Sequence, residues 1–276
     1  MSAEHFFPMI DLLPERLGQK PRDRGKTMLV DMGIPAGQLL DLLDLTKDYI
    51  DYGKLAFGSP ALYPKQVLSE KLAIYKNADI RVFLGGQFLE FVLYKSGWSH
   101  VSTFVNEARA LGIDAVEISD NLVPISMSDK LKLVAMILDG GLGVHGEVGS
   151  KDDKGDPSEL IDQAHAFISA GCTDVLFEAA EMVDEAGQPI HQLIETIGKS
   201  DVHDKAMYEL PGPWIKGVGP SGVYEMMKLM VSVFGPNANI GNVWHDQVFI
   251  LECMRHGLSA SGPLEIMNQS ALRATD

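Results

Sequence analysis

Acidic side chains close most of the short apolar segments of this chain. The positions are Asp31, Glu117, Asp120, Glu147, Glu178, Glu181 and Glu209. Carboxylates that are brought together repel one another unless a cation or a shared proton lies between them, so such a group suits a hard divalent cation such as magnesium. The alternative is that single acids cap helices or pair with basic residues. We take as candidate metal ligands Asp31, Glu117, Glu147 and Glu178.

Two lysines and a histidine lie among these acids. Lys54 stands near the end of the second apolar segment, and Lys151 follows the fifth. Each lysine is either part of the chemistry or a salt-bridge partner at the rim. His145 lies inside an apolar segment, and we interpret it as a hydrogen-bonded core residue rather than a ligand or base.

A glycine-rich segment, GVGPSG at 217–222, separates the seventh apolar segment from a helical pattern that begins near Ser221. It matches the spacing of a dinucleotide fingerprint, but that motif follows the first strand of a βαβ unit and has an acid about 20 residues on. Asn242 stands there instead, so we reject dinucleotide binding. A loop at this place in a barrel often binds phosphate, whereas the alternative is a flexible or lid-forming loop. The candidate phosphate-binding residues are Lys216, Gly217 and Gly219.

Eight apolar segments alternate with helical patterns along the chain. The expected strands are 27–33, 49–58, 81–86, 115–121, 143–149, 174–181, 205–212 and 237–243. Helix signals fall between them: Pro64 is placed to open one helix, and Asp156 followed by Pro157 starts another. Eight such units favour a closed (β/α)8 TIM barrel, an α/β fold, over an open doubly wound sheet. The active site of such a barrel lies at the carboxyl ends of its strands.

The composition sets wider limits. The chain has 276 residues, with 23 Lys and Arg against 38 Asp and Glu, which gives a net charge of −15. This balance argues against nucleic acid and acidic membrane surfaces as partners. We expect one domain over 1–276, with an N-terminal extension at 1–25 and a C-terminal tail at 259–276. The start of the chain lacks the pattern of a signal peptide, and no apolar segment is long enough to span a membrane, so we expect a cytoplasmic protein.

Several stretches resemble the phosphosulfolactate synthase family. They read KPRDRGKTMLVDMG at 20–33, DYIDYGKLAFGSPALYP at 48–64, GGQFLE at 85–90, EISDN at 117–121, EVGSK at 147–151 and, more weakly, NANIGNVWHDQV at 237–248. The resemblance implies a (β/α)8 barrel that adds sulfite to phosphoenolpyruvate with Mg²⁺ as cofactor, on a route to coenzyme M or sulfolactate. It implies a carbon–sulfur lyase with small anionic substrates, and we expect a homo-oligomer.

The resemblance also implies roles for particular residues. Lys20, Arg22 and Lys54 would neutralise phosphate or carboxylate, and we add Gly241 to the candidate substrate-binding residues. Sulfite attacks the methylene carbon of the enol phosphate in this chemistry, and a general acid then protonates the adjacent carbon. We interpret Lys151 as the catalytic proton donor, because a Lys-Lys pair of the family survives only there. The alternative catalytic donor is Lys54.

The chain departs from the family pattern at four positions near these motifs. They are Gln87, Asn121, Ser150 and Ala180, of which the last replaces an arginine suited to gripping phosphate or carboxylate. These changes leave two further hypotheses open. One is a related metal-dependent addition or aldol-type lyase that acts on another small oxyacid. The other is a non-catalytic interaction protein, because plant heat-stress-associated proteins resemble the same family.

Overall fold

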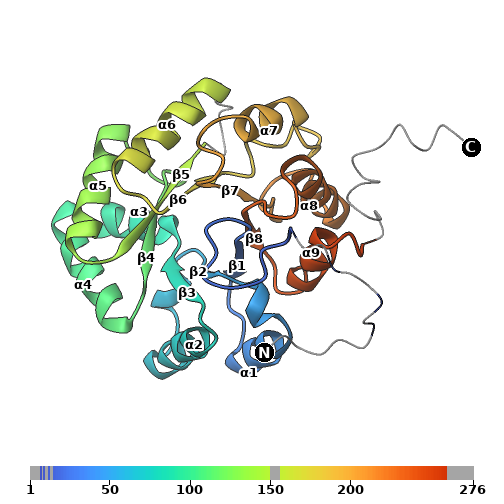
Figure 1. Ribbon diagram of the computed structural model, residues 1–276. Coiled ribbons are helices and arrows are strands. Elements are labelled where there is room, and N and C mark those ends of the chain that lie inside the picture. The colour runs from blue at the N-terminus through green and yellow to red at the C-terminus, as the bar shows by residue number, and fades with distance from the viewer. Residues whose placement is uncertain (1–6, 8, 10–11, 13–14, 150–155, 260–276) are drawn as a thin grey trace, which may run out of the picture.

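The strands of this protein close into a parallel barrel in sequence order, as the computed structural model describes for residues 7, 9, 12, 15–149 and 156–259. Figure 1 shows the ring of strands inside a ring of helices. The strands are β1 Thr27–Asp31, β2 Tyr52–Leu55, β3 Arg81–Leu84, β4 Ala115–Ile118, β5 Gly143–Val148, β6 Asp174–Phe177, β7 Ala206–Glu209 and β8 Ile240–Val243. Each lies within a segment expected from the sequence. The predicted (β/α)8 barrel is confirmed.

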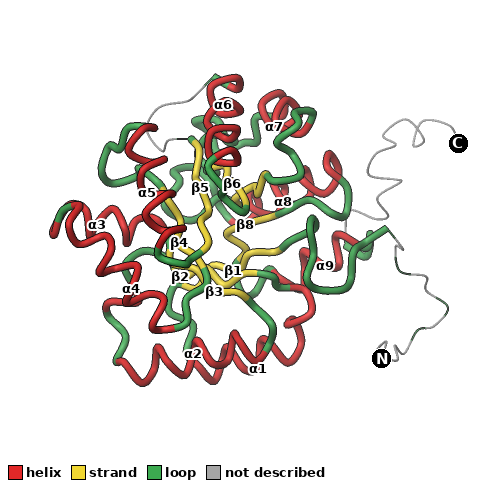
Figure 2. The backbone as a smooth tube through the Cα atoms, turned by 60° about the vertical axis from the view of Figure 1, so that its left-hand side comes forward, coloured by secondary structure: helices red, strands yellow, loops and turns green. Residues whose placement is uncertain are grey.

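The helices cover the outside of the barrel (Figure 2). They are α1 Ala36–Thr46, α2 Lys65–Asn77, α3 Gly86–Ser96, α4 Val101–Leu111, α5 Met127–Asp139, α6 Pro157–Ser169, α7 His191–Gly198, α8 Pro220–Phe234 and α9 Val248–Arg255. Short 3-10 helices lie at Lys47–Tyr49, Ser59–Ala61 and Trp98–His100. Asp156 caps α6 as predicted, because its side chain accepts a hydrogen bond from the Ser158 amide. Among the described residues no helix is both long and apolar enough to cross a membrane.

The side chains that point into the barrel form two layers. An apolar layer near the amino ends of the strands contains Met28, Tyr52, Phe83, Ala115, Leu176 and Met207. His145 lies beside it, 3% exposed, with its ring 4.6 Å from that of Phe83. Its core position is as predicted, but Nδ1 has no hydrogen-bond partner within the described part of the chain. Burial lowers the pKa of His145 to about 4, so the ring is neutral at pH 7.

The second layer is polar and lies towards the carboxyl ends of the strands. Side chains alternate across a strand, so the residue two positions after each member of the apolar layer also faces inwards. Lys54 follows Tyr52, Glu117 follows Ala115, and Glu209 follows Met207 in this way. The barrel therefore places charged residues directly above an apolar floor.

Side-chain contacts hold the segment before β1 against the barrel. In Figure 1 the dark-blue chain lies across the ring of strands. Arg16 Nε pairs with Glu252 Oε1 of α9 at 2.9 Å, and the Leu17 amide donates to Asn237 Oδ1 at 3.0 Å. Residues 15–26 therefore pack against the amino end of the barrel, and most of the expected extension before residue 15 lies outside the described residues. Of the expected tail at 259–276, all but Ser259 lies outside the described residues.

Candidate active site

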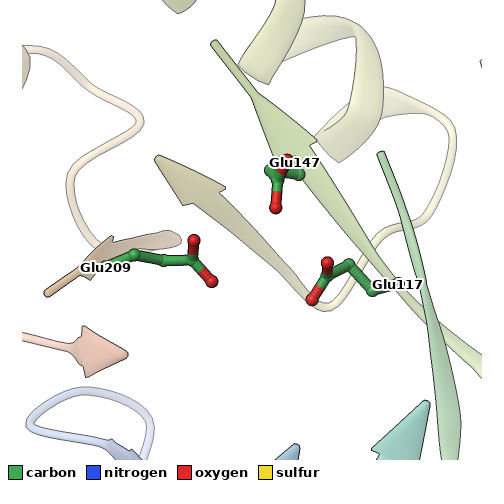
Figure 3. Close-up of side chains that lie close together, drawn as sticks. All are labelled: Glu117, Glu147 and Glu209. Atoms are coloured by element: carbon green, nitrogen blue, oxygen red, sulfur yellow. The ribbon is translucent and has the colours of Figure 1, made fainter. Parts of the chain in front are cut away.

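Three buried glutamates converge at the carboxyl end of the barrel. Glu209 is the last residue of β7, and Glu117 and Glu147 are the last residues but one of β4 and β5. Each of the three offers a carboxylate oxygen within 4.8 Å of those of the other two. Figure 3 shows the three carboxylates reaching from different strands towards a common space. All three are at most 2% exposed. We call these three residues the carboxylate cluster.

Lys54 is the counter-ion of the carboxylate cluster. Its Nζ lies 2.7 Å from Glu117 Oε2 and 2.8 Å from Glu209 Oε1. Burial alone lowers the pKa of Lys54, but the charges of Glu117 and Glu209 outweigh burial, and the pKa is raised above its ordinary value. Lys54 therefore stays positively charged at neutral pH.

One lysine does not neutralise three carboxylates, and the pKa values of the glutamates reflect this. Burial and then the charges of Glu117 and Glu178 raise the pKa of Glu147 well above its usual range. Burial raises the pKa of Glu209 to about 7, with Lys54 opposing the rise and Glu178 adding to it. Without a further cation the cluster therefore retains protons that exposed glutamates lose near pH 4.

Neighbouring groups hold the carboxylates in place. The Gly86 amide, at the start of α3, donates to Glu117 Oε1 at 3.0 Å. Asn121 Nδ2 donates to Glu147 Oε1 at 2.6 Å. Gly86 also packs against Ser119 so closely that a Cβ atom at this glycine would lie 2.2 Å from Ser119 Oγ. Only glycine therefore lets the start of α3 come close to the end of β4.

A pocket opens above the cluster and has an aromatic rim. Phe57, after β2, and Trp214, after β7, contact each other edge to face with ring centroids 5.8 Å apart. Polar side chains also line this pocket, namely those of Gln87, Asn121 and Asn242. Two of the four departures from the family pattern, Gln87 and Asn121, thus lie at the site itself.

The predicted metal ligands divide into two groups. Glu117 and Glu147 lie together in the cluster, and Glu178 lines the same pocket, where its Oε1 accepts from the Ala180 amide at 3.2 Å. Asp31 does not join them, because it faces outwards from β1 towards α2. There its carboxylate lies 2.7 Å from Lys71 Nζ and 2.8 Å from the Tyr75 hydroxyl. The prediction for Asp31 is corrected: the residue joins β1 to α2.

Two predicted substrate-binding residues lie at the opposite end of the barrel. Lys20 Nζ donates to four backbone carbonyls just before β2 and β3, at 2.8 to 3.0 Å. Burial lowers the pKa of this ammonium group. Arg22 Nε pairs with Asp51 Oδ1 at 3.0 Å. The structure therefore separates Lys20 and Arg22 from the carboxylate cluster, and both fasten the segment before β1.

The glycine-rich loop lies between β7 and α8. Lys216, Gly217 and Gly219 are exposed there and do not line the pocket, to which the same loop contributes Trp214. Gly217 packs against Gly187, where a Cβ atom would lie 2.6 Å from the Gly217 carbonyl.

Two predicted site residues remain, Gly241 and Lys151, and the structure describes only the first. Gly241, in β8, faces the apolar layer, since a Cβ atom there would lie 2.6 Å from Met28 Cε. It therefore lies below the pocket rather than in its lining. Lys151 lies outside the described residues.

Sequence reasoning missed part of this site. The predicted ligand set omits Glu209, although this residue is one of the strand-end acids. The predicted site residues also omit Asn242, Phe57 and Trp214. The alternation of side chains along a strand identifies Glu209, because Met207 and Glu209 share a face in the same way as Ala115 and Glu117. Phe57 and Trp214 lie in loops, where no periodicity marks an inward direction.

The cluster has the chemistry of a site for a hard cation. Carboxylate oxygens are the preferred ligands of magnesium and similar ions, and three of them face one space. The raised pKa values of Glu209 and Glu147 reflect burial beside other carboxylates, and a divalent cation would offset this negative charge. The residues present thus fit a divalent metal.

Comparisons with known proteins identify relatives of this chain. The sequence model of the (2R)-phospho-3-sulfolactate synthase (ComA) family matches residues 15–261. Phosphosulfolactate synthase of Methanothermobacter thermautotrophicus is 30% identical over 90% of this chain and 94% of its own length. The Bacillus subtilis protein of the same name is 28% identical over 89% and 94%. The Arabidopsis thaliana protein HEAT-STRESS-ASSOCIATED 32 is 24% identical over 86% and 87%.

Solved structures support the fold alone. A crystal structure of 3-hexulose-6-phosphate synthase matches with a TM-score of 0.52 and 16% identity, over 85% of this chain and 100% of that one. Phosphonopyruvate hydrolase in complex with oxalate and magnesium matches with a TM-score of 0.51 and 12% identity, over 84% and 80%. The sequence relatives are more specific, since they span most of both chains. This chain therefore belongs to the (2R)-phospho-3-sulfolactate synthase (ComA) family.

Proposed function

We propose that this protein catalyses the magnesium-dependent addition of sulfite to phosphoenolpyruvate, which gives 2-phospho-3-sulfolactate. The observation that carries the proposal is the carboxylate cluster with Lys54, buried at the carboxyl end of the barrel in a member of this family. A buried group of like charges is costly to a fold, and its presence in a pocket points to chemistry rather than to stability.

The reaction forms a carbon–sulfur bond and moves one proton. The sulfur lone pair of sulfite attacks the methylene carbon, the double bond shifts, and negative charge develops towards the carboxylate of the substrate. A proton then adds to the adjacent carbon. Glu117, Glu147 and Glu209 would hold the magnesium ion, which when bound supplies positive charge to that carboxylate.

Lys54 serves in this scheme as a fixed cation beneath the reacting groups. Its ammonium group is shared between Glu117 and Glu209, and its raised pKa makes it a reluctant proton donor. We therefore propose that Lys54 offsets the negative charge of the cluster so that anionic substrates can enter. The assignment of the donor to Lys151 stays a prediction.

Adduct formation tests the proposal directly. The purified protein is incubated with phosphoenolpyruvate, sulfite and magnesium, and the adduct is detected by mass spectrometry. We expect the adduct with the wild type and with Glu107→Gln, a control on the exposed surface of α4, and a loss of at least about 100-fold with Glu147→Gln. A folded wild-type protein that yields no adduct would rule out this reaction.

A second candidate function is the addition of sulfite or another nucleophile to a different small oxyacid. Gln87 and Asn121 favour it, because these departures from the family pattern line the pocket. Ala180 adds to this, since an arginine grip on phosphate or carboxylate is missing there. If this candidate is right, Ala180→Arg raises activity with phosphoenolpyruvate; no gain would count against it.

A barrel kept only as an interaction scaffold predicts no response to magnesium. A site predicts that magnesium at about 100 times its dissociation constant stabilises the fold by about 2.7 kcal/mol, a rise of roughly 5 °C in Tm. We expect this shift in differential scanning fluorimetry of the wild type and of Glu107→Gln. We expect none in Glu147→Gln. An unresponsive wild type would favour the scaffold.

A further inference from the structure

A second, larger cavity lies at the amino end of the barrel, under the segment that precedes β1. Its volume is about 910 Å³, within the range of small-molecule sites. Six basic residues line it, namely Arg16, Arg22, Arg24, Lys26, Arg81 and Lys205, against two acidic ones, Asp23 and Asp204. In a chain of net charge −15, this is a local reversal of sign.

Three of these basic residues form the rigid wall of the cavity. Arg16, Arg22 and Lys26 are buried, and their charges are balanced by Glu252, Asp51 and Asp174 at 2.9, 3.0 and 2.6 Å. They have no spare charge to offer a ligand. Because they tie the segment before β1 to β2, β6 and α9, however, they fix the shape of the cavity.

The other three basic residues are free to bind. Arg24, Arg81 and Lys205 are exposed, and none forms an ion pair with any residue that the structure describes. Arg81 is already oriented, since its guanidinium lies 4.7 Å from the ring centre of Tyr52 and donates to the Tyr52 hydroxyl at 3.0 Å. Its remaining N–H groups stay available to an anion.

An unpartnered polar atom belongs to a residue that lines a neighbouring cavity. A smaller cavity shares Tyr52, Arg81 and Thr173 with the large one and reaches His145. His145 Nδ1 is buried, has no hydrogen-bond partner among the described residues, and lies 3.7 Å from Asp174 Oδ2, beyond hydrogen-bonding distance. Buried polar atoms are nearly always satisfied, so this atom points to a bound molecule or water in the smaller cavity.

We propose that this cavity binds a phosphorylated small molecule that carries two or more anionic groups, held by Arg24, Arg81 and Lys205. The apolar layer of the barrel separates it from the carboxylate cluster, so it is independent of the active site. Asp23 and Asp204 border the cavity as well, and they select for a ligand that brings enough charge to outweigh them. A single inorganic phosphate is therefore expected to bind more weakly than a pyrophosphate group.

Calorimetric titration with inorganic pyrophosphate tests the proposal, with EDTA present to keep metal ions out of the carboxylate cluster. We expect saturable binding to the wild type and at least tenfold weaker binding to the double variant Arg24→Ser, Lys205→Ser. Arg81→Gln should weaken binding to a similar degree, whereas Lys65→Ser, on the exposed surface of α2, should match the wild type. Inorganic phosphate serves as the weaker comparison probe.

The active-site variant Glu147→Gln separates this site from the catalytic one. We expect it to bind pyrophosphate as the wild type does, whether or not it forms the sulfite adduct. Two results would overturn the proposal: no saturable heat with the wild-type protein, or an affinity that the double variant leaves unchanged. In the second case the anion binds elsewhere on the molecule.

Discussion

The balance of charge within the carboxylate cluster governs the pKa values of its glutamates and their capacity to bind a metal ion. Lys54 offsets part of the charge of Glu117 and Glu209, and burial together with the remaining negative charge raises the pKa of Glu209 to about 7. A divalent cation would offset this charge and displace the proton, so metal binding and proton release are coupled. The pH dependence of the metal-free protein therefore reports on the cluster.

The raised pKa of Glu209 predicts how the stability of the metal-free protein depends on pH. This pKa is about 7 in the folded protein and near 4.3 in an unfolded chain, so the folded state binds more protons between these values. This contribution to stability is present at low pH and is lost as the pH rises through 7. We expect the Tm of the metal-free wild type to fall by roughly 5 °C more between pH 5 and pH 8 than that of Glu209→Gln.

The exposed-surface variant Glu107→Gln is the control for that measurement and should behave as the wild type does. Equal pH dependence in the wild type and in Glu209→Gln would contradict a raised pKa at Glu209. Magnesium should also bind more tightly as the pH rises through 7, since the ion competes with the proton.

Asn121 provides a second prediction, since it orients one carboxylate of the cluster through its 2.6 Å hydrogen bond to Glu147. Groups that orient metal ligands typically contribute 10- to 100-fold to metal affinity. We expect Asn121→Ala to weaken magnesium binding by about tenfold or more, as measured by titration of the thermal shift. Asn106→Ala, on the exposed face of α4, should leave the affinity unchanged. If Asn121→Ala binds magnesium as tightly as the wild type, Asn121 does not orient Glu147 for metal binding.

At the scale of the elements, strand parity decides which acids enter the barrel. Glu117, Glu147 and Glu209 share the inward parity of their strands, whereas Asp31 shares the outward face of β1 with Leu29. Asp31 instead meets Lys71 and Tyr75 of α2. A shift of one position along a strand therefore turns an acid from the inside of the barrel, where it can bind a metal, to the outside, where it contacts a helix.

Asp31→Asn tests this assignment. The substitution leaves the fully buried Lys71 without its counter-charge, which typically costs about 3–5 kcal/mol. We expect a lower free energy of unfolding by urea, with the magnesium-dependent thermal shift retained. A variant of normal stability that has lost the response to magnesium would instead return Asp31 to the metal site.

For the whole molecule, the arrangement of charge opposes its proposed substrates. The chain carries −15, and its carboxylates gather at the end where anions must enter, whereas unpaired cations gather at the other end. Salt screens such repulsion, because the Debye length falls from about 30 Å at 0.01 M to about 8 Å at 0.15 M. Screening should therefore speed the entry of anions.

The rate of sulfite addition at varied salt concentration checks this expectation. We expect kcat/KM for phosphoenolpyruvate to rise severalfold as the ionic strength increases from 0.01 to 0.15 M, by analogy with electrostatic effects on association. A neutral osmolyte at equal osmolality should have no effect. A steady fall of kcat/KM with added salt would show that local cations, rather than net charge, control the entry of the substrate.

The expected homo-oligomer stays a prediction, and sedimentation velocity measures the number of subunits.

The amino-acid sequence is sufficient to predict the barrel, because alternating apolar segments and capped helices are local patterns that each unit carries. It also determined that acids would collect at the carboxyl ends of the strands, since chain order and strand direction fix that end. Glu117, Glu147 and Lys54 were identified on this basis, with the motifs of the family, and the structure brings them together.

Which charged residues meet depends on how the whole chain folds. Lys20 and Arg22 stand beside family motifs, yet they fold back onto the amino end, because the segment before β1 must satisfy carbonyls there. Glu209 and Asp31 both end strands, but Glu209 points into the barrel and Asp31 points out towards α2. They differ because successive side chains of a strand face opposite sides of the sheet. Phe57 and Trp214 meet across two loops far apart in sequence. Such contacts join residues that lie far apart in the sequence, and local patterns do not specify which distant side chains meet.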